Sequence, residues 1–181
     1  MPLIFPASTG FAALFLSDFL RLRVSAAAGP VSAAGYVLVA ASVAGFAAAG
    51  LREWSFFSLS AFAGAAVSVV FGALLVYSVF IEIPAAKKRL GLAADVAVSS
   101  GTYGFSRHPG FLWFAGLMAG LVLFRGGEGA AFAAFITAQD FLLVAVQDAF
   151  FFPRFFVNYG DYKSRVPFLL GPGGGGAHGQ R

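Results

Sequence analysis

The sequence contains no cysteine and only two histidines among its 181 residues. The absence of cysteine excludes disulfide bonds, thiolate metal sites and a cysteine nucleophile, and two histidines are too few for a histidine-rich metal site. We therefore expect no bound metal. Charged residues are also scarce, at 11% of the chain. Soluble domains usually contain about 25%, so the composition is not that of a typical soluble domain.

Hydrophobic residues are abundant instead, at 59% of the chain, and the mean hydropathy is +0.83. The apolar runs approach the roughly 20 residues that a helix needs to cross a hydrocarbon core about 30 Å thick. The two-residue alternation of a transmembrane β-barrel is absent. The composition predicts an all-α, polytopic membrane protein with the lipid bilayer as its environment, and we expect no nucleic-acid partner.

The apolar runs divide into five predicted transmembrane helices. They lie at residues 3–19, 31–51, 56–83, 109–124 and 129–152. Helix breakers separate them, and we expect Pro84 to end the third helix and Gly126-Gly127 to form the turn between the fourth and fifth. No basic segment of a secretory signal precedes the first run, so we expect that helix to be retained.

Basic residues are distributed unequally between the two sides of this predicted bundle. Ten Lys and Arg residues fall on one side, and only Arg52 and Arg125 fall on the other. Because basic residues are retained in the cytoplasm, the N-terminus is predicted outside and the C-terminus in the cytoplasm. We expect a multi-pass protein of the cytoplasmic membrane in a bacterium or of the endoplasmic reticulum in a eukaryote.

One domain accounts for most of the chain. Residues 1–170 are predicted to form a single transmembrane domain, and the Gly-rich segment 171–181 is predicted to be disordered. Small residues recur at four-residue spacing, as at Gly116 and Gly120, which predicts close helix packing and indicates nothing about chemistry. The sequence leaves the oligomeric state open, because such faces serve either internal packing or a dimer.

The segment YGFSRHPGFLWF, residues 103–114, places Arg107, His108 and Pro109 directly before the fourth apolar run. Proline is favoured at the first position of a helix, so His108 is predicted to be the N-cap. A helix N-terminus and the guanidinium fork of Arg107 suit an anionic group. The alternative is that Arg107 only anchors the helix at the interface and that Pro109 only starts it.

The fifth predicted helix contains four polar residues, namely Gln139, Asp140, Gln147 and Asp148. Carboxylates in a spanning segment are costly and usually face the bundle interior or a functional cavity. Asp140 and either Gln147 or Asp148 are predicted to share one helical face. Asp148 lies nearest the cytoplasmic end, where it is expected to meet the region of His108. The alternative is that Arg154 or Arg107 merely neutralises Asp148.

Two blocks of the sequence resemble one family. The run GTYGFSRHPGF, residues 101–111, is similar to the G-x-Y-x-x-x-R-H-P-x-Y/F signature of the isoprenylcysteine carboxyl methyltransferases and the related phospholipid methyltransferases. Gln147-Asp148 and the run FFVNYGDYKSRVP, residues 155–167, resemble the family's E-E-x-x-L…F-G-x-x-Y-x-x-Y-x-x-x-V-P pattern. The resemblance covers residues 101–167. It departs from the family where Gln147-Asp148 replaces Glu-Glu, Phe156 replaces Gly and Phe111 replaces Tyr.

The resemblance implies a methyltransferase that uses S-adenosylmethionine and a lipophilic small molecule or prenylated substrate. Its implied catalytic residues are Arg107, His108 and Asp148, with no metal ligand. Its implied cofactor-binding residues are Tyr103, His108, Pro109, Phe111, Gln147, Asp148, Tyr159 and Tyr162. An acceptor carboxylate, with a pKa of about 3.5, is already ionised at pH 7 and needs no base. We therefore expect the carboxylate of a prenylcysteine or of a similar small lipophilic acid as the acceptor.

Three other functions stay open at the level of sequence. A phospholipid amine N-methyltransferase would need His108 or Asp148 as a base, because its acceptor must lose a proton. A lipid reductase of related architecture would bind NADPH in place of the sulfonium cofactor. A non-enzymatic membrane protein or small transporter would use Asp140 and Asp148 for proton or substrate passage.

Overall fold

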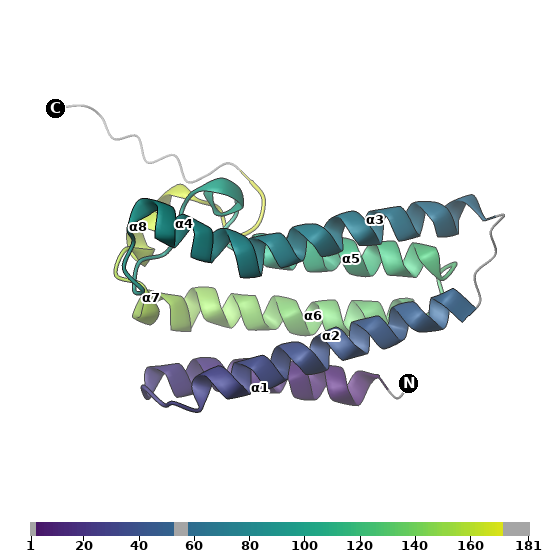
Figure 1. Cartoon of the computed structure of the whole chain (residues 1–181), viewed down its shortest axis with the longest axis horizontal. Coiled ribbons are helices and arrows are strands. Elements are labelled where there is room, and N and C mark those ends of the chain that lie inside the picture. Colours follow the sequence, from purple (N-terminus) through teal and green to yellow (C-terminus); the bar gives the residue numbers. More distant parts are fainter. Residues whose placement is uncertain (1–2, 53–57, 172–181) are drawn as a thin grey trace.

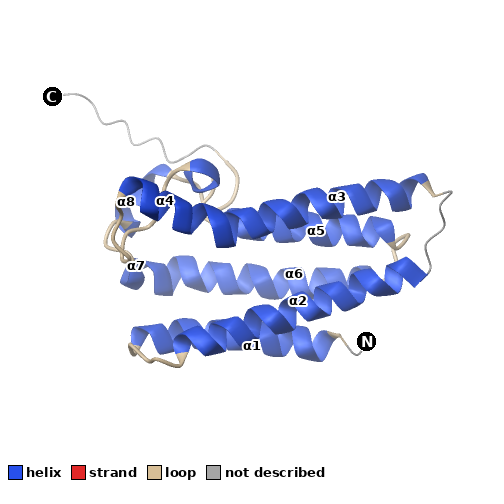
Figure 2. Cartoon of the chain, in the orientation of Figure 1, coloured by secondary structure: helices blue, strands red, loops and turns tan. Residues whose placement is uncertain are grey.

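The computed structural model describes residues 3–52 and 58–171, and every regular element within these ranges is a helix (Figure 2). The prediction of an all-α fold is therefore confirmed for the described part of the chain. The predicted disordered segment 171–181 lies outside the described residues except for Gly171, and residues 56–57 of the predicted third helix lie outside them as well.

A helix lies at each of the five predicted positions. The long helices are α1 Ile4–Leu22, α2 Ala28–Arg52, α3 Leu59–Val76, α5 Pro109–Phe124 and α6 Ala130–Val146. The short helices are α4 Ile83–Leu90, α7 Phe152–Phe155 and α8 Tyr159–Arg165. The π-helical turn η1 Tyr77–Glu82 joins α3 to α4, the π-helical turn η3 Gln147–Phe151 joins α6 to α7, and the 3-10 turn η2 Gly101–Gly104 precedes α5.

Three helical runs in the described ranges are long and apolar enough to cross a membrane. They are Ala28–Arg52, Leu59–Leu90 and Ala130–Phe155. Helix α5 is also apolar but has only 16 residues. These lengths and this composition agree with the prediction of a membrane protein.

The third helix does not end at Pro84, contrary to the prediction. It continues through α4 to Leu90, and Gly91 ends it in the left-handed conformation with φ of 61°. Proline lacks the amide N–H and crowds the carbonyl one turn earlier, which normally breaks a helix. The π-helical turn η1 ends at Glu82, two residues before Pro84, and already departs from the α-helical hydrogen-bond pattern. The helix therefore continues past the proline.

Two antiparallel helix pairs make up most of the bundle. Helix α1 packs along α2, helix α3 packs along α5, and α6 contacts both α1 and α5 (Figure 1). The α3–α5 contact depends on glycine, because a Cβ atom at Gly64 would lie 2.2 Å from the backbone nitrogen of Phe124. Gly120 faces the same contact from α5, where its Cβ would lie 2.8 Å from the nitrogen of Ser68. The prediction that small residues allow close packing is confirmed here.

The short helices gather at one end of the bundle. Helices α4, α7 and α8 lie there together with the loop that precedes α5, whereas the start of α1 and the α5–α6 turn lie at the opposite end (Figure 1). The two motif blocks, residues 101–111 and residues 147–148 with 155–167, both lie at the end with α4, α7 and α8 (Figure 1). Residues from distant parts of the sequence therefore lie side by side there.

Candidate functional site

A buried cluster of polar side chains lies where α5 begins. Asp148 accepts hydrogen bonds at Oδ1 from Arg107 Nε at 2.7 Å and at Oδ2 from Arg107 Nη2 at 3.2 Å. The Tyr159 hydroxyl donates to Oδ1 at 2.7 Å, and Lys163 Nζ donates to Oδ2 at 2.9 Å. His108 Nε2 lies 3.3 Å from Oδ1. We refer to these five residues as the Asp148 cluster.

Two adjacent side chains of the π-helical turn η3 point in different directions, as neighbours on a helix do. Asp148 meets the loop before α5, whereas Gln147 Nε2 donates to Asp18 Oδ2 of α1 at 2.7 Å. π-helical turns are frequent at functional sites. The structure therefore does not bring Gln147 to the Asp148 cluster, contrary to its predicted place among the cofactor-binding residues. Asp140 is not in the cluster either.

Arg107 joins the two motif blocks. Its Nη1 donates to the carbonyl oxygens of Lys163 at 2.9 Å and Val166 at 2.8 Å, and its backbone N–H donates to Pro167 at 3.0 Å. Asp148 accepts from Nε and Nη2 of the same guanidinium. Acceptors within the protein therefore occupy the group that we predicted would bind an anionic ligand. The alternative in which Arg107 neutralises Asp148 is observed, and Arg154 instead donates to the Phe150 carbonyl.

His108 is the N-cap of α5, as predicted, and Pro109 starts the helix. The imidazole stacks on Phe152 with ring centroids 5.7 Å apart and an interplanar angle of 13°. Burial lowers the pKa of His108 below its ordinary value, and the hydrogen bond to Asp148 opposes that shift. His108 is therefore a neutral imidazole near pH 7, with Nε2 directed at the carboxylate.

The predicted tyrosines lie around the same loop. Tyr162 donates to the carbonyl oxygen of Tyr103 at 2.8 Å, and Tyr103 donates to that of Ser78 at 3.3 Å. Tyr159 and Tyr162 pack with Ala97 in a small core of their own. Burial raises the pKa of Tyr103, Tyr159 and Tyr162, so all three remain neutral donors at physiological pH.

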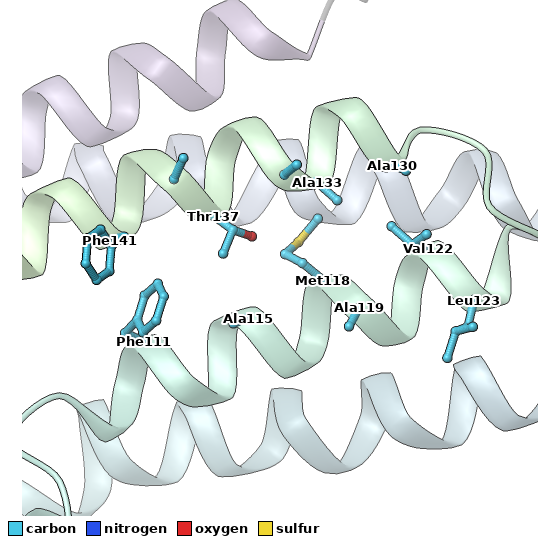
Figure 3. A pocket seen from close by; sticks show the side chains of 12 residues that line it. Phe111, Ala115, Met118, Ala119, Val122, Leu123, Ala130, Ala133, Thr137 and Phe141 are labelled. Carbon is cyan, nitrogen blue, oxygen red and sulfur yellow. The ribbon is translucent and has the colours of Figure 1, made fainter. Parts of the chain in front are cut away.

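An apolar groove runs between α5 and α6 beside the cluster. Its volume is about 720 Å³, and the lining includes Phe111, Met118, Thr137 and Phe141 (Figure 3). The rings of Phe111 and Phe141 meet edge to face, with centroids 5.5 Å apart and an interplanar angle of 60° (Figure 3). The ring of Phe168 packs against two others, with its centroid 6.0 Å from that of Phe141 and 5.0 Å from that of His108. A continuous series of aromatic rings therefore leads from the groove to the Asp148 cluster.

Two polar residues that were not predicted as site residues hold the surrounding loops; Glu82 was expected only as an interfacial anchor paired with a basic residue. The Glu82 carboxylate accepts hydrogen bonds from the backbone N–H of Thr102 at 2.7 Å and from the Thr102 hydroxyl. The Asn158 amide accepts from the Ala97 N–H at 2.7 Å and donates to the Ala97 carbonyl at 3.0 Å. Both contacts join segments that are distant in sequence, so no local pattern indicates them.

Two further positions refine the sequence interpretation. Phe156 has φ of −121° and ψ of 122°, an extended conformation that any residue adopts, so this turn does not require the family's glycine. Lys163 was missed, although it lies four residues after Tyr159 in α8. Residues four apart share a helical face, so the spacing from Tyr159, a predicted site residue, could have indicated that Lys163 also reaches the site.

The fold and the site define an all-helical protein with three helices of membrane-spanning length and apolar composition, and with a buried ion cluster at one end of the bundle. No family model, no curated protein and no solved structure matches the chain. The likeness to the methyltransferases therefore rests on the residues of segment 101–167 themselves.

Proposed function

We propose that the protein is an S-adenosylmethionine-dependent methyltransferase, similar to the isoprenylcysteine carboxyl O-methyltransferases, that acts on a lipid-like acceptor at the cytoplasmic membrane face. The observation that carries the proposal is the convergence of the two motif blocks. Arg107 and His108 from one block meet Asp148 and Tyr159 from the other beside an apolar groove.

Methyl transfer from a sulfonium is an in-line displacement, so the protein mainly aligns donor and acceptor and excludes water. Asp148 is the anionic group of the cluster and already pairs with Arg107 and Lys163, so a cationic group of the cofactor would take the place of the half-exposed Lys163. Aromatic faces also attract a sulfonium, and Tyr159 and Tyr162 belong to the same site. The groove accommodates the apolar chain of an acceptor, with Phe111 and Phe141 at its junction with the cluster.

The hydrogen bonding of the cluster favours a carboxylate acceptor over an amine. An amine must lose a proton during methylation, and His108 and Asp148 are the residues considered as its base. Both oxygens of Asp148 accept hydrogen bonds from protein donors, and His108 Nε2 is directed at Oδ1. A carboxylate needs no base, so the proposed acceptor is a prenylcysteine or a similar small lipophilic acid.

In this proposal all five long helices cross the membrane, with the N-terminus outside. Helix α5, with 16 residues, is about 24 Å long, so its first turn and the Asp148 cluster lie near the cytoplasmic interface. The unequal distribution of Lys and Arg supports this orientation, because the helix ends that bear most of them lie at the end with α4, α7 and α8 (Figure 1).

The test is calorimetric binding of S-adenosylmethionine and of its demethylated product to the detergent-purified protein. We expect micromolar binding to the wild type, and binding at least tenfold weaker in Asp148→Asn and in His108→Gln. Asp140→Asn is the matched control, because Asp140 lies on the same helical run and makes no contact with the cluster. Circular dichroism first verifies that each variant is folded. Transfer of a labelled methyl group to a prenylcysteine analogue then tests the acceptor.

One observation favours a non-enzymatic alternative. Asp140 lies within the run Ala130–Phe155 and has no hydrogen bond or ion pair to any residue in 3–52 or 58–171. Unpaired carboxylates in membrane helices often serve proton or substrate passage. Absence of cofactor binding by the folded wild type, together with ion flux in vesicles that Asp140→Asn abolishes, would replace the methyltransferase proposal. Binding of NADPH instead would indicate the reductase.

A further inference from the structure

The partners of Asp148 differ in how firmly the fold holds them. The side chains of Arg107 and His108 are 7% and 4% exposed, and Tyr159 is 2% exposed. The side chain of Lys163 is 47% exposed. Three donors are therefore fixed by packing, whereas the ammonium of Lys163 reaches the carboxylate from the surface.

The two carboxylate oxygens of Asp148 also differ. Oδ1 lies among the buried partners, since Arg107 Nε, the Tyr159 hydroxyl and His108 Nε2 all surround it. Oδ2 has Arg107 Nη2 at 3.2 Å and Lys163 Nζ at 2.9 Å. The one partner of Asp148 that is half exposed therefore bonds to Oδ2, so Oδ2 is the oxygen that becomes available when Lys163 moves away.

The side chain of Lys163 is not needed to hold Arg107 in place. Arg107 Nη1 bonds to the backbone carbonyl of Lys163, and a substitution of the side chain retains that carbonyl. Pairs between an exposed lysine and a carboxylate contribute little to stability, because the flexible side chain loses entropy and water screens the charges. An ammonium group of a ligand can therefore replace the ammonium of Lys163 at small cost.

We propose that Lys163 Nζ occupies a subsite for a primary ammonium group, and that the amino-acid portion of the cofactor displaces it from Asp148 Oδ2. This inference rests on the proposed function and assigns one part of the cofactor to one atom of the site. A primary ammonium donates hydrogen bonds as Lys163 does, whereas a sulfonium has no N–H to donate. The α-amine of the cofactor therefore lies at Oδ2, and the methyl-bearing sulfur lies farther from it.

The experiment compares three ligands by calorimetry. S-adenosylmethionine has the amine and the sulfonium, S-adenosylhomocysteine keeps the amine without the sulfonium, and 5′-methylthioadenosine lacks the amino-acid portion. Lys163→Met removes the competing ammonium. The matched control is Arg165→Met, which removes one positive charge from the same short helix, where Arg165 Nε bonds to the Asp161 carbonyl and, within the described ranges, to no residue of the cluster.

We expect Lys163→Met to bind both amine-containing ligands about fivefold more tightly than the wild type, as loss of a competing exposed ion pair allows. Its affinity for 5′-methylthioadenosine should change less than twofold, and Arg165→Met should bind all three ligands as the wild type does. Equal gains for all three ligands would mean that Lys163 only obstructs the entrance and would overturn the assignment of the amine.

The results separate this inference from the proposed function. Binding of S-adenosylmethionine to the wild type with no tighter binding in Lys163→Met overturns the displacement of Lys163 and leaves the methyltransferase proposal intact. Absence of binding in the wild type and in both folded variants overturns the methyltransferase proposal, and the assignment of the amine with it. Binding in Lys163→Met alone overturns the displacement of Lys163, because the wild-type lysine would then exclude the cofactor instead of yielding to it, and leaves a cofactor site at the cluster in place.

Discussion

Asp140 and Asp148 lie on one continuous helical run, Ala130–Phe155, but have opposite surroundings. Asp148 is 5% exposed and accepts hydrogen bonds from Arg107, Tyr159 and Lys163. Asp140 has no such partner within the described ranges. The same change from carboxylate to amide should therefore affect the two positions differently.

We expect Asp148→Asn to lower the free energy of unfolding by roughly 3–5 kcal/mol, because it leaves the buried guanidinium of Arg107 without its counter-charge. Asp140→Asn should leave the free energy of unfolding unchanged or raise it, since it removes an unpaired charge from a membrane helix. Unfolding in mixed detergent micelles measures both. Equal losses in the two variants would show that the ion cluster does not stabilise the fold.

His108 makes stability depend on pH. Burial lowers the pKa of His108 below its ordinary value of 6.5, so the unfolded chain binds a proton more readily than the folded one. The contribution of neutral His108 to the free energy of unfolding is therefore fully present above about pH 6.5. It is lost as the pH falls from there through the lower pKa that His108 has in the folded protein.

The free energy of unfolding, measured between about pH 7.5 and 5, should decrease toward the acid side of this range. His108→Gln should flatten the profile. His178→Gln, which changes the second of the two histidines, should retain it. A slope that persists in His108→Gln would assign the titration to another group.

Helices α3 and α5 approach each other closely at Gly64. A Cβ at Gly64 would lie 2.2 Å from a backbone nitrogen of α5, and backbone atoms on both sides cannot turn away as a side chain does. Gly72 lies two turns later on α3, where a Cβ would meet only Leu117 Cδ1, at 3.8 Å. The two glycines therefore offer a matched pair on one helix.

We expect Gly64→Ala to separate the helices and to cost about 1–3 kcal/mol of unfolding free energy, as overpacking does. Gly72→Ala should stabilise by about 0.5–1 kcal/mol, because alanine restricts the unfolded chain and the site has room. Thermal unfolding of the two variants in one detergent distinguishes these signs. A stable Gly64→Ala would mean that α3 and α5 shift apart at little cost.

The two ends of the whole molecule differ in their content of Lys and Arg, and each has an exposed position for a label. The exposed residue Ser164, in α8, lies at the end with the Asp148 cluster, and the exposed residue Glu128 lies at the turn between α5 and α6. The proposed orientation places the first in the cytoplasm and the second outside. Because the chain has no cysteine, a single introduced thiol reports its own side of the membrane.

We expect Ser164→Cys to react with a membrane-impermeant maleimide only after inside-out vesicles expose the cytoplasmic face, and Glu128→Cys to react in intact cells. The opposite pattern would reverse the orientation, and equal labelling of both from one face would contradict a crossing by α6. The cysteine-free parent chain is the control for background labelling.

Local sequence signals were enough to predict the positions of the five long helices, because helices in an apolar chain depend on local hydropathy and on local helix signals. The runs of apolar residues predicted all five long helices, Pro109 predicted the start of α5, and small residues such as Gly120 predicted close packing. Local signals failed at Pro84, where the preceding π-helical turn changes what proline does to a helix.

The groups around Asp148, in contrast, follow from helix packing and not from any local pattern. Arg107 lies 41 residues away in the chain, and no periodicity encodes a contact over that separation. Gln147 meets α1 and Asp148 meets the loop before α5; adjacent helical residues lie on different faces, and only the packing decides which element each face meets. The partners of a buried charge are set by how helices pack, because each donor must reach the carboxylate where water does not.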